Sequence, residues 1–226
     1  FQHTPDAEKF VEGIAAKLDG VWILEFPYTL RTLETLQFDQ FYHEHYYYWL
    51  IKPLKKLLSK FGLNIFHCEE VSVHGGSMRC WITNKDQYGT TKADEKFIKK
   101  EESFDYNRFM SAVWTKIIKD QSFLNNLDGS VALFGAAAKG CVYLNALNSW
   151  KLTNTYCIDD TLQKQGKFIP GTEIEVVSRS YLKYNKPDNI VIMAHNFGPQ
   201  IAKSLINDGY KGRLITMLPE IEIDRA

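Results

Sequence analysis

The chain has 226 residues, of which 45% are hydrophobic and 14% aromatic, and its 27 basic residues balance its 27 acidic residues. This composition supplies a sizeable core and argues against disorder. A net charge of zero argues against nucleic-acid partners, whose binding domains usually carry a clustered basic excess. No apolar run approaches the roughly 18 residues of a membrane span, and no signal peptide is recognisable, so we expect a cytoplasmic protein without a membrane partner.

The four cysteines have no close C-x-x-C spacing, and each lies in an apolar run. They are Cys68, Cys80, Cys141 and Cys157. Buried free thiols behave as small hydrophobic groups, which indicates a reducing compartment and no zinc or redox motif. Because the first residue is Phe1 rather than methionine, we expect the chain to be a piece of something longer.

The first part of the chain alternates between helical and strand patterns. Residues 7–18 place apolar side chains on one helix face, and the continuous apolar run "VWILEF" (21–26) predicts a buried parallel strand. A basic amphipathic helix is predicted over 51–61, followed by strands over 63–73 and 77–83 that are joined by "HGG".

A polar, glycine-containing loop or linker is expected at 84–95, followed by a long helical pattern over 95–126. A second alternation follows, with strands predicted over 131–136, 153–158, 189–194 and 213–218, and helices near 140–149, 178–185 and 198–208. Strands that alternate with helices imply a parallel sheet with helices on both faces. The sequence therefore predicts two α/β parts joined by a helical connector.

The stretch "QFYHEHYYYW" (40–49) places histidines and a carboxylate in an aromatic setting, beyond the carboxyl end of strand 21–26. Ligands of open α/β sheets bind at that end, which makes Tyr42, Glu44 and His45 candidate site residues. Histidine suits general-base work near neutral pH, and an adjacent carboxylate can orient the imidazole. Two alternatives stay open: a metal site using His43 and His45, for which no third ligand is evident, or plain aromatic core.

Two glycine-rich turns are candidate ligand contacts. In "VHGGSMR" (73–79), backbone amides and Ser77 could meet an anionic or polar ligand, whose close approach Gly75 and Gly76 would allow; an ordinary hairpin turn is the alternative. In "VALFGAAAKG" (131–140), a strand runs into a helix whose start carries Lys139, a natural phosphate site. A tight turn needed only for packing is the alternative, since the segment matches neither G-x-G-x-x-G nor a Walker loop.

Two further polar segments follow predicted strands in the same half. The loop "KQGKFIPG" (164–171) offers Lys164, Gln165 and Lys167, and "AHNF" (194–197) offers His195 and Asn196. Because strand ends of one parallel sheet meet at one edge, we expect these groups to converge with Lys139 on one pocket.

Together these motifs carry a resemblance to a known family. They are "GVWILEFPYTLRTLETLQFDQFYHEHYYYW", "EEVSVHGGSMRCWI", "GAAAKG", "DDTLQKQGKFIPGTEIEV" and "AHNF…LPEIEI". The chain resembles the sugar-nucleotide C-methyltransferases, whose members have a zinc-binding domain, a Rossmann-type S-adenosylmethionine-binding domain and a Rossmann-like C-terminal domain. The resemblance implies an α/β fold, with the end of the methyltransferase domain at 1–83, a helical connector at 84–127 and the C-terminal domain at 128–226.

The resemblance also implies roles for single residues. His45 matches the family's base in the motif Tyr-x-Glu-His, Tyr42 and Glu44 match its supporting residues, and His3, in "QHTPD", resembles a further family histidine. The implied reaction removes the proton next to a sugar ketone, after which the enolate carbon attacks the methyl group of S-adenosylmethionine. Motifs resembling the pocket for the nucleotide-diphosphate ketosugar contain Gly75, Gly76, Lys139 and Lys164. His195 stands where many relatives have tryptophan.

The glycine-rich cofactor loop, an acidic residue ending a second strand, and the zinc-ligand cysteines are not found in this sequence. The resemblance therefore implies that S-adenosylmethionine binds mainly outside this chain and that zinc belongs only to a missing N-terminal domain, so no metal site is expected here. Two other functions stay open: a noncatalytic nucleotide-sugar-binding module using residues from about 128 onward, and an O-methyltransferase.

Overall fold

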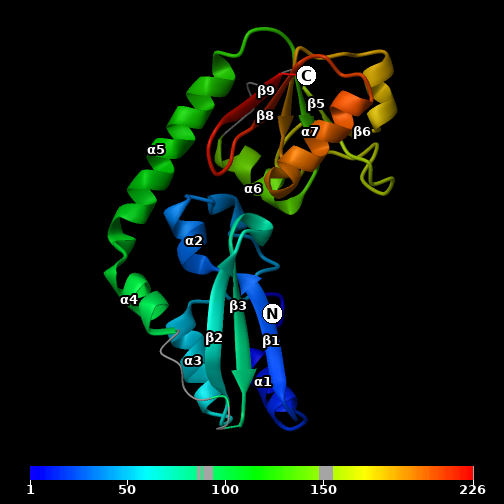
Figure 1. Cartoon of the computed structure of the whole chain (residues 1–226). Coiled ribbons are helices and arrows are strands. Elements are labelled where there is room, and N and C mark those ends of the chain that lie inside the picture. The colour runs from blue at the N-terminus through cyan, green and yellow to red at the C-terminus, as the bar shows by residue number, and fades with distance from the viewer. Residues whose placement is uncertain (86–87, 89–93, 148–154, 226) are drawn as a thin grey trace. The chain divides into compact units, whose positions relative to one another are not determined.

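The computed structural model describes residues 1–85, 88, 94–147 and 155–225 (Figure 1). The chain divides into two compact units. Unit 1 comprises Phe1–Thr35 and His43–Phe109, and unit 2 comprises Leu36–Tyr42 and Met110–Ala226. The segment Leu36–Tyr42 is thus an excursion into unit 2 made between two stretches of unit 1.

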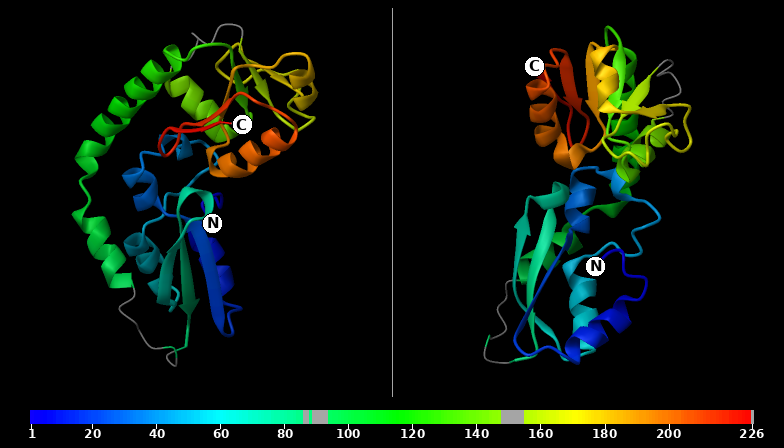
Figure 2. Two further views of the ribbon diagram at one scale, coloured as in Figure 1. Left: turned by 45° about the horizontal axis from the view of Figure 1, so that its top comes forward. Right: turned by 90° about the vertical axis from the view of Figure 1, so that its right-hand side faces the viewer.

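Unit 1 is a three-stranded sheet with helices packed on it (Figures 1 and 2). Its elements are α1 (Ala7–Ala15), β1 (Val21–Pro27), α2 (Thr29–Glu34), α3 (Ile51–Ser59), β2 (Asn64–Val71), the 3₁₀ turn η2 (Val73–Gly75), β3 (Ser77–Thr83) and α4 (Glu95–Ser103). The strand order is β1-β3-β2, and both β1 and β2 run antiparallel to β3. The apolar stripe of α3, formed by Ile51, Leu54 and Leu58, is fully buried in this core.

Strand β1 differs from the prediction. Its side chains alternate, with Leu24 and Phe26 buried while Ile23 is 56% exposed, and its partner β3 runs antiparallel. Glu25 lies opposite Arg79 in this register, and their side chains form an ion pair of 2.8 Å. The prediction of a buried parallel strand was wrong, because a short apolar run has the same pattern in a half-covered antiparallel strand.

Unit 2 contains the second α/β arrangement. Its elements are η1 (Phe38–Gln40), most of α5 (Tyr106–Asn125), β4 (Val131–Phe134), α6 (Ala138–Ala146), β5 (Tyr156–Ile158), β6 (Glu175–Val177), η5 (Arg179–Lys183), β7 (Asn189–Ile192), η6 (His195–Phe197), α7 (Gly198–Asn207), β8 (Arg213–Thr216) and β9 (Glu222–Arg225).

The sheet of unit 2 has the order β6-β5-β4-β7-β8-β9, in which only the pairing of β8 with β9 is antiparallel. Every residue of β7 is buried, as expected for a central parallel strand. The chain leaves β4 toward one side of the sheet for β5 and leaves β7 toward the other for β8. Right-handed crossovers then place α6 and α7 on opposite faces (Figure 2). The predicted parallel sheet with helices on both faces is confirmed.

Several local predictions differ in detail. The helical pattern over 95–126 forms two helices, because Phe104 takes an extended conformation between α4 and α5. The helix predicted over 178–185 is the 3₁₀ helix η5, and strands β6 and β9 were not predicted. Strand β5 begins at Tyr156, and residues 148–154, which include the ends of a predicted helix and strand, lie outside the described residues.

Candidate active site

The histidine-rich stretch forms a turn followed by extended chain. A turn at His43 and Glu44 reverses the backbone, and the following residues run beside residues 2–5 of the same unit. The amide of Tyr46 donates to the carbonyl oxygen of Gln2 at 2.9 Å, and the hydroxyl of Tyr47 donates to that of Pro5 at 3.3 Å. This pairing brings two candidates that are distant in the sequence, His3 and His45, to one place.

The rings of His3 and His45 meet edge to face, with 4.9 Å between their centroids and an interplanar angle of 69°. Nδ1 of His3 lies 3.0 Å from the carbonyl oxygen of Glu44. Because a carbonyl oxygen only accepts, Nδ1 carries the proton, and the lone pair of a neutral His3 is on Nε2. His3 is exposed and His45 is half-buried, so both rings are open to a ligand rather than locked in the core.

The aromatic residues after His45 alternate between interior and surface. Trp49 is 7% exposed and stacks between Phe1 and Tyr47, with centroid distances of 4.8 and 5.1 Å. Tyr48 points the other way, is 37% exposed, and contacts the His45 ring edge to face at 5.8 Å. The reading of this stretch as plain core therefore fits Trp49, whereas Tyr48 borders His45.

Tyr42 and Glu44 were expected to support His45, with the Glu44 carboxylate orienting its imidazole. Tyr42 is half-buried in the bend before the turn, and the Glu44 side chain is exposed. The contact that residue 44 makes with a histidine in the described structure is through its backbone carbonyl, to His3. Glu44 thus orients an imidazole by its main chain, which sequence reasoning did not foresee.

The turn containing Gly75 and Gly76 is tightly built. His74 has φ of 55°, and both glycines have positive φ. A Cβ atom on Gly76 would lie 2.4 Å from Cγ of Arg31, so glycine is needed there for packing. The Gly76 amide and the Ser77 hydroxyl both donate to the carbonyl oxygen of Val73, at 3.0 Å each. In this structure both donors are therefore used within the turn itself.

The polar segments of unit 2 follow the carboxyl ends of neighbouring strands of its sheet. Lys139, Lys164 and Asn196 follow the carboxyl ends of β4, β5 and β7, which are adjacent strands with β4 in the middle. Lys139 is half-buried in the first turn of α6, and Asn196 is half-buried in η6. The strand order reverses between β4 and β7, the position where open α/β sheets bind ligands.

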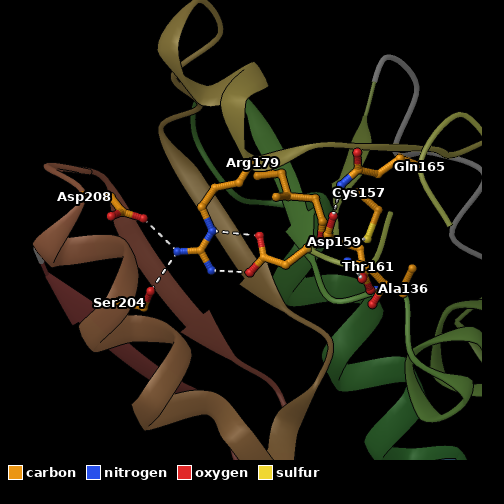
Figure 3. Close-up of polar contacts among 10 residues, drawn as sticks. Ala136, Cys157, Asp159, Thr161, Gln165, Arg179, Ser204 and Asp208 are labelled. Carbon is orange, nitrogen blue, oxygen red and sulfur yellow. Dashed lines mark hydrogen bonds and ion pairs between the residues drawn. The ribbon is translucent and has the colours of Figure 1, made fainter. Parts of the chain in front are cut away.

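Asp159 organises this edge (Figure 3). One oxygen of its carboxylate accepts from the amide of Ala136 at 2.8 Å and pairs with the ammonium of Lys164 at 3.2 Å, and the other accepts from the amide of Thr161 at 2.8 Å. Burial alone would raise the pKa of Asp159, but the Thr161 hydrogen bonds and the charge of Lys164 hold that pKa below its usual value. Lys164 is therefore already paired with an internal carboxylate.

Asp159 is also the acidic residue that sequence reasoning failed to find at the end of a second strand. It directly follows β5, the strand after β4. The signal was present in the sequence as Asp159-Asp160 after an apolar strand. The neighbouring carboxylate, Asp160, binds Arg179, with Nε to Oδ1 at 2.9 Å and Nη2 to Oδ2 at 2.5 Å.

Arg179 in turn connects three elements of the sheet edge (Figure 3). Its Nη1 donates to Ser204 Oγ and to Asp208 Oδ2, at 2.7 Å each, and its guanidinium lies 5.0 Å from the centre of the Phe134 ring. The bidentate ion pair of Arg179 with Asp160, together with its hydrogen bonds to Ser204 and Asp208, restrains η5 and α7 relative to β5. We read this network as structural support for the edge.

His195 was expected to face the same crevice as Lys139, but it is 7% exposed and packs edge to face on Tyr143 at 5.3 Å. Burial, and then the nearby charges of Lys139 and Lys116, lower the pKa of His195 to about 3. The ring therefore stays neutral at physiological pH. Its role at the edge is that of a packed interior group.

Comparisons with known proteins identify the family of the chain. A family model described as "C-methyltransferase C-terminal domain" matches residues 72–219. The chain belongs to this C-methyltransferase family. It is also 29% identical, over 241 aligned positions, to the C-methyltransferase NovU of Streptomyces niveus. That alignment includes 100% of this chain and 57% of NovU, so the chain spans little more than half of the relative's length.

The family match divides the candidate residues into two groups. Gly75, Gly76, Lys139, Lys164 and Asn196 fall inside the matched range. The histidine turn and His3 precede that range but lie inside the alignment with NovU, which includes the whole chain. The C-methyltransferase family membership therefore rests mainly on unit 2.

Among residues 1–85, 88, 94–147 and 155–225, no helix is both long and apolar enough to cross a bilayer. The same part of the chain holds no group of three or more histidine, cysteine or acidic side chains placed to bind a metal ion. All four cysteines are free thiols.

Proposed function

We propose that this chain carries the proton-abstracting and substrate-binding residues of an S-adenosylmethionine-dependent C-methyltransferase whose substrate is a nucleotide-linked ketosugar. The observation that carries the proposal is the meeting of the His3 and His45 rings, 42 residues apart in the sequence, in a chain of the C-methyltransferase family. A solvent-accessible imidazole is the side chain best suited to remove a proton at neutral pH.

His45 is the proposed base. Its neutral ring takes the proton from the carbon next to the sugar ketone, and the electrons of the broken C–H bond move into the enolate. The proposal gives His3 the task of receiving or sharing that proton, because its Nδ1–H is held by the Glu44 carbonyl and its Nε2 is then the acceptor. The Tyr48 ring borders His45 and, in this proposal, limits access of water to the carbanion.

When bound, S-adenosylmethionine would supply an electrophilic methyl group: the enolate carbon would form the new carbon–carbon bond while the methyl–sulfur bond breaks, and the donor would leave as a neutral thioether. The chain does not fit the whole donor site. Within the described part of unit 1, the glycine-rich turn that follows the carboxyl end of a strand is the one after β2, and the Gly76 amide and Ser77 hydroxyl there already donate to the carbonyl oxygen of Val73. We therefore place only the proton transfer and the sugar-nucleotide contacts on this chain.

The proposed place for the nucleotide diphosphate is the turn between β4 and α6. Helix α6 has no side-chain cap at its N-terminus, where Ala137 precedes the helix and Lys139 adds a positive charge. Backbone amides and a lysine at a helix start are suited to an anion. Lys164 is a weaker contact in this proposal, because Asp159 already neutralises its charge. Asn196 is a candidate hydrogen-bond donor to a hydroxyl or phosphate of the ligand.

Product analysis tests the reaction class. The protein expressed from its complete coding sequence is incubated with a nucleotide-linked ketosugar and S-adenosylmethionine labelled with ¹³C in the methyl group, and the product is examined by NMR. We expect the labelled methyl carbon to couple directly to a ring carbon. A label found on oxygen would show an O-methyltransferase, and nucleotide-sugar binding without any transfer would favour a noncatalytic binding module.

A further inference from the structure

A buried acidic residue next to Lys139 has no part in the function proposed above. Asp39 lies in η1, the short 3₁₀ helix that precedes the histidine turn and belongs to unit 2. There η1 packs on α6, and the ring of Phe38 stacks on that of Tyr143 with 5.6 Å between centroids. This packing places Asp39 beside the helix that carries Lys139.

The carboxylate of Asp39 is enclosed and incompletely paired. The residue is 2% exposed, and within the described residues its Oδ1 has no hydrogen-bond partner. Its nearby cations are Lys139 on α6 and Lys116 on α5. Lys116 already pairs with Asp120 at 3.0 Å and donates to the carbonyl oxygen of Met217, so Lys139 is the cation left to balance Asp39.

Burial dominates the electrostatics of both partners. It raises the pKa of Asp39 to about 6, although Lys139 and Lys116 act in the opposite direction. It also lowers the pKa of Lys139, although Asp39 opposes that change. A carboxyl group with this pKa exchanges its proton close to neutral pH, and a second negative charge brought near it would favour the protonated form.

We propose that Asp39 is the internal counter-ion of Lys139, and that a pyrophosphate group bound at the β4–α6 turn competes with it, so that ligand binding drives proton uptake by Asp39. This inference rests on the proposed function, because it places the pyrophosphate at Lys139. It adds a residue, indicated by no motif in the sequence, that makes the affinity for the anion depend on pH.

The pH dependence has a defined sign. In the free chain Asp39 loses its proton above about pH 6, and the bound anion shifts this loss to higher pH. Affinity for the anion therefore rises as pH falls toward about 6 and becomes constant below it. The neighbouring titratable groups do not produce this effect: His195, which the charges of Lys139 and Lys116 reach, has a pKa of about 3, and Tyr143, which the charge of Asp39 reaches, has its pKa raised mainly by burial.

The test is calorimetric binding of thymidine-diphosphate glucose to the full 226-residue chain between about pH 5.5 and 8. Each phosphate of this probe carries one ester and one anhydride bond, so its single acidic group stays ionised and does not titrate in that range. If the bound anion raises the pKa of Asp39 by about one unit, the native chain should bind the probe about tenfold more tightly at about pH 5.5 than at about pH 8. We expect Asp39→Asn, which keeps the shape but cannot ionise, to bind with an affinity that changes less than about twofold over the same range.

Two matched variants make the outcomes distinct. Asp128→Asn removes an exposed carboxylate at the amino end of β4 and should keep the native pH profile. Lys139→Met should weaken binding at every pH. If Lys139→Met binds normally, the pyrophosphate site of the proposed function is wrong, and the inference falls with it. If Lys139→Met weakens binding but Asp39→Asn keeps the native pH profile, the inference alone is overturned.

Discussion

Replacing His45 with asparagine is expected to lower kcat for methyl transfer by about 10²–10⁴-fold, the usual contribution of a general base. Asparagine is close to histidine in size and polarity but cannot take up a proton. Because the substitution leaves the sugar-nucleotide contacts of unit 2 unchanged, KM for the ketosugar should change much less. Steady-state kinetics of the protein expressed from its complete coding sequence would measure both constants.

The same turn offers a control for this experiment. His43 is exposed, lies two residues before His45, and can be replaced with asparagine in the same way. We expect His43→Asn to keep kcat within about threefold of the native value, since no proton transfer is assigned to it. An equal loss in both variants would mean that the turn has been disturbed, and a His45→Asn enzyme with native kcat would remove His45 as the base.

The largest expected effect on stability comes from Glu101, a buried carboxylate of α4. Its Oε1 accepts from the amide of Ile51 at 2.6 Å and from the hydroxyl of Tyr28 at 2.9 Å, and its Oε2 accepts from the amide of Lys52 at 3.1 Å. Glu101 thus caps the N-terminus of α3, where the preceding residue Leu50 provides no side-chain cap. The helix that carries the core of unit 1 depends on this contact.

Glu101→Ala would leave two amides and one hydroxyl without their acceptor, and we expect a loss of about 3–5 kcal/mol in the free energy of unfolding of unit 1. Hydrogen exchange of the Ile51 and Lys52 amides measures the effect locally, without assuming that the chain unfolds in one step. The neighbouring Glu102 forms an exposed ion pair with Lys52, so Glu102→Ala should cost less than about 0.5 kcal/mol. Unchanged protection of both amides in Glu101→Ala would contradict the capping role.

The sequence predicts unit 2 well because its strands are short, continuously apolar and separated by helices. This pattern requires parallel pairing, and parallel pairing brings the ends of β4, β5 and β7 together. The edge strands β6 and β9 have the same lengths as β5 and β4, but they include charged residues and lack a continuous apolar run, so they were not found. The predicted direction of β1 was wrong because its partner β3 lies at least fifty residues away in the sequence and does not alter the local pattern of "VWILEF".

In the candidate site, too, local motifs were visible in the sequence, whereas contacts between distant residues were not. The motif Tyr-x-Glu-His marked His45, but its meeting with His3 depends on backbone pairing between residues distant in sequence. Asp39 and Glu101 were missed because each belongs to an ordinary polar segment. Their importance arises from burial against another element, and burial of a single acidic side chain leaves no periodic signal in the sequence.

The central claim is that His45 removes a proton from the carbon next to a ketone. It is tested most directly by incubating the protein expressed from its complete coding sequence with a nucleotide-linked ketosugar in D₂O, without a methyl donor, and following the α-carbon proton by NMR. The account predicts that deuterium replaces this proton with the native protein and with His43→Asn, but not with His45→Asn. Exchange by His45→Asn at the native rate would contradict the account.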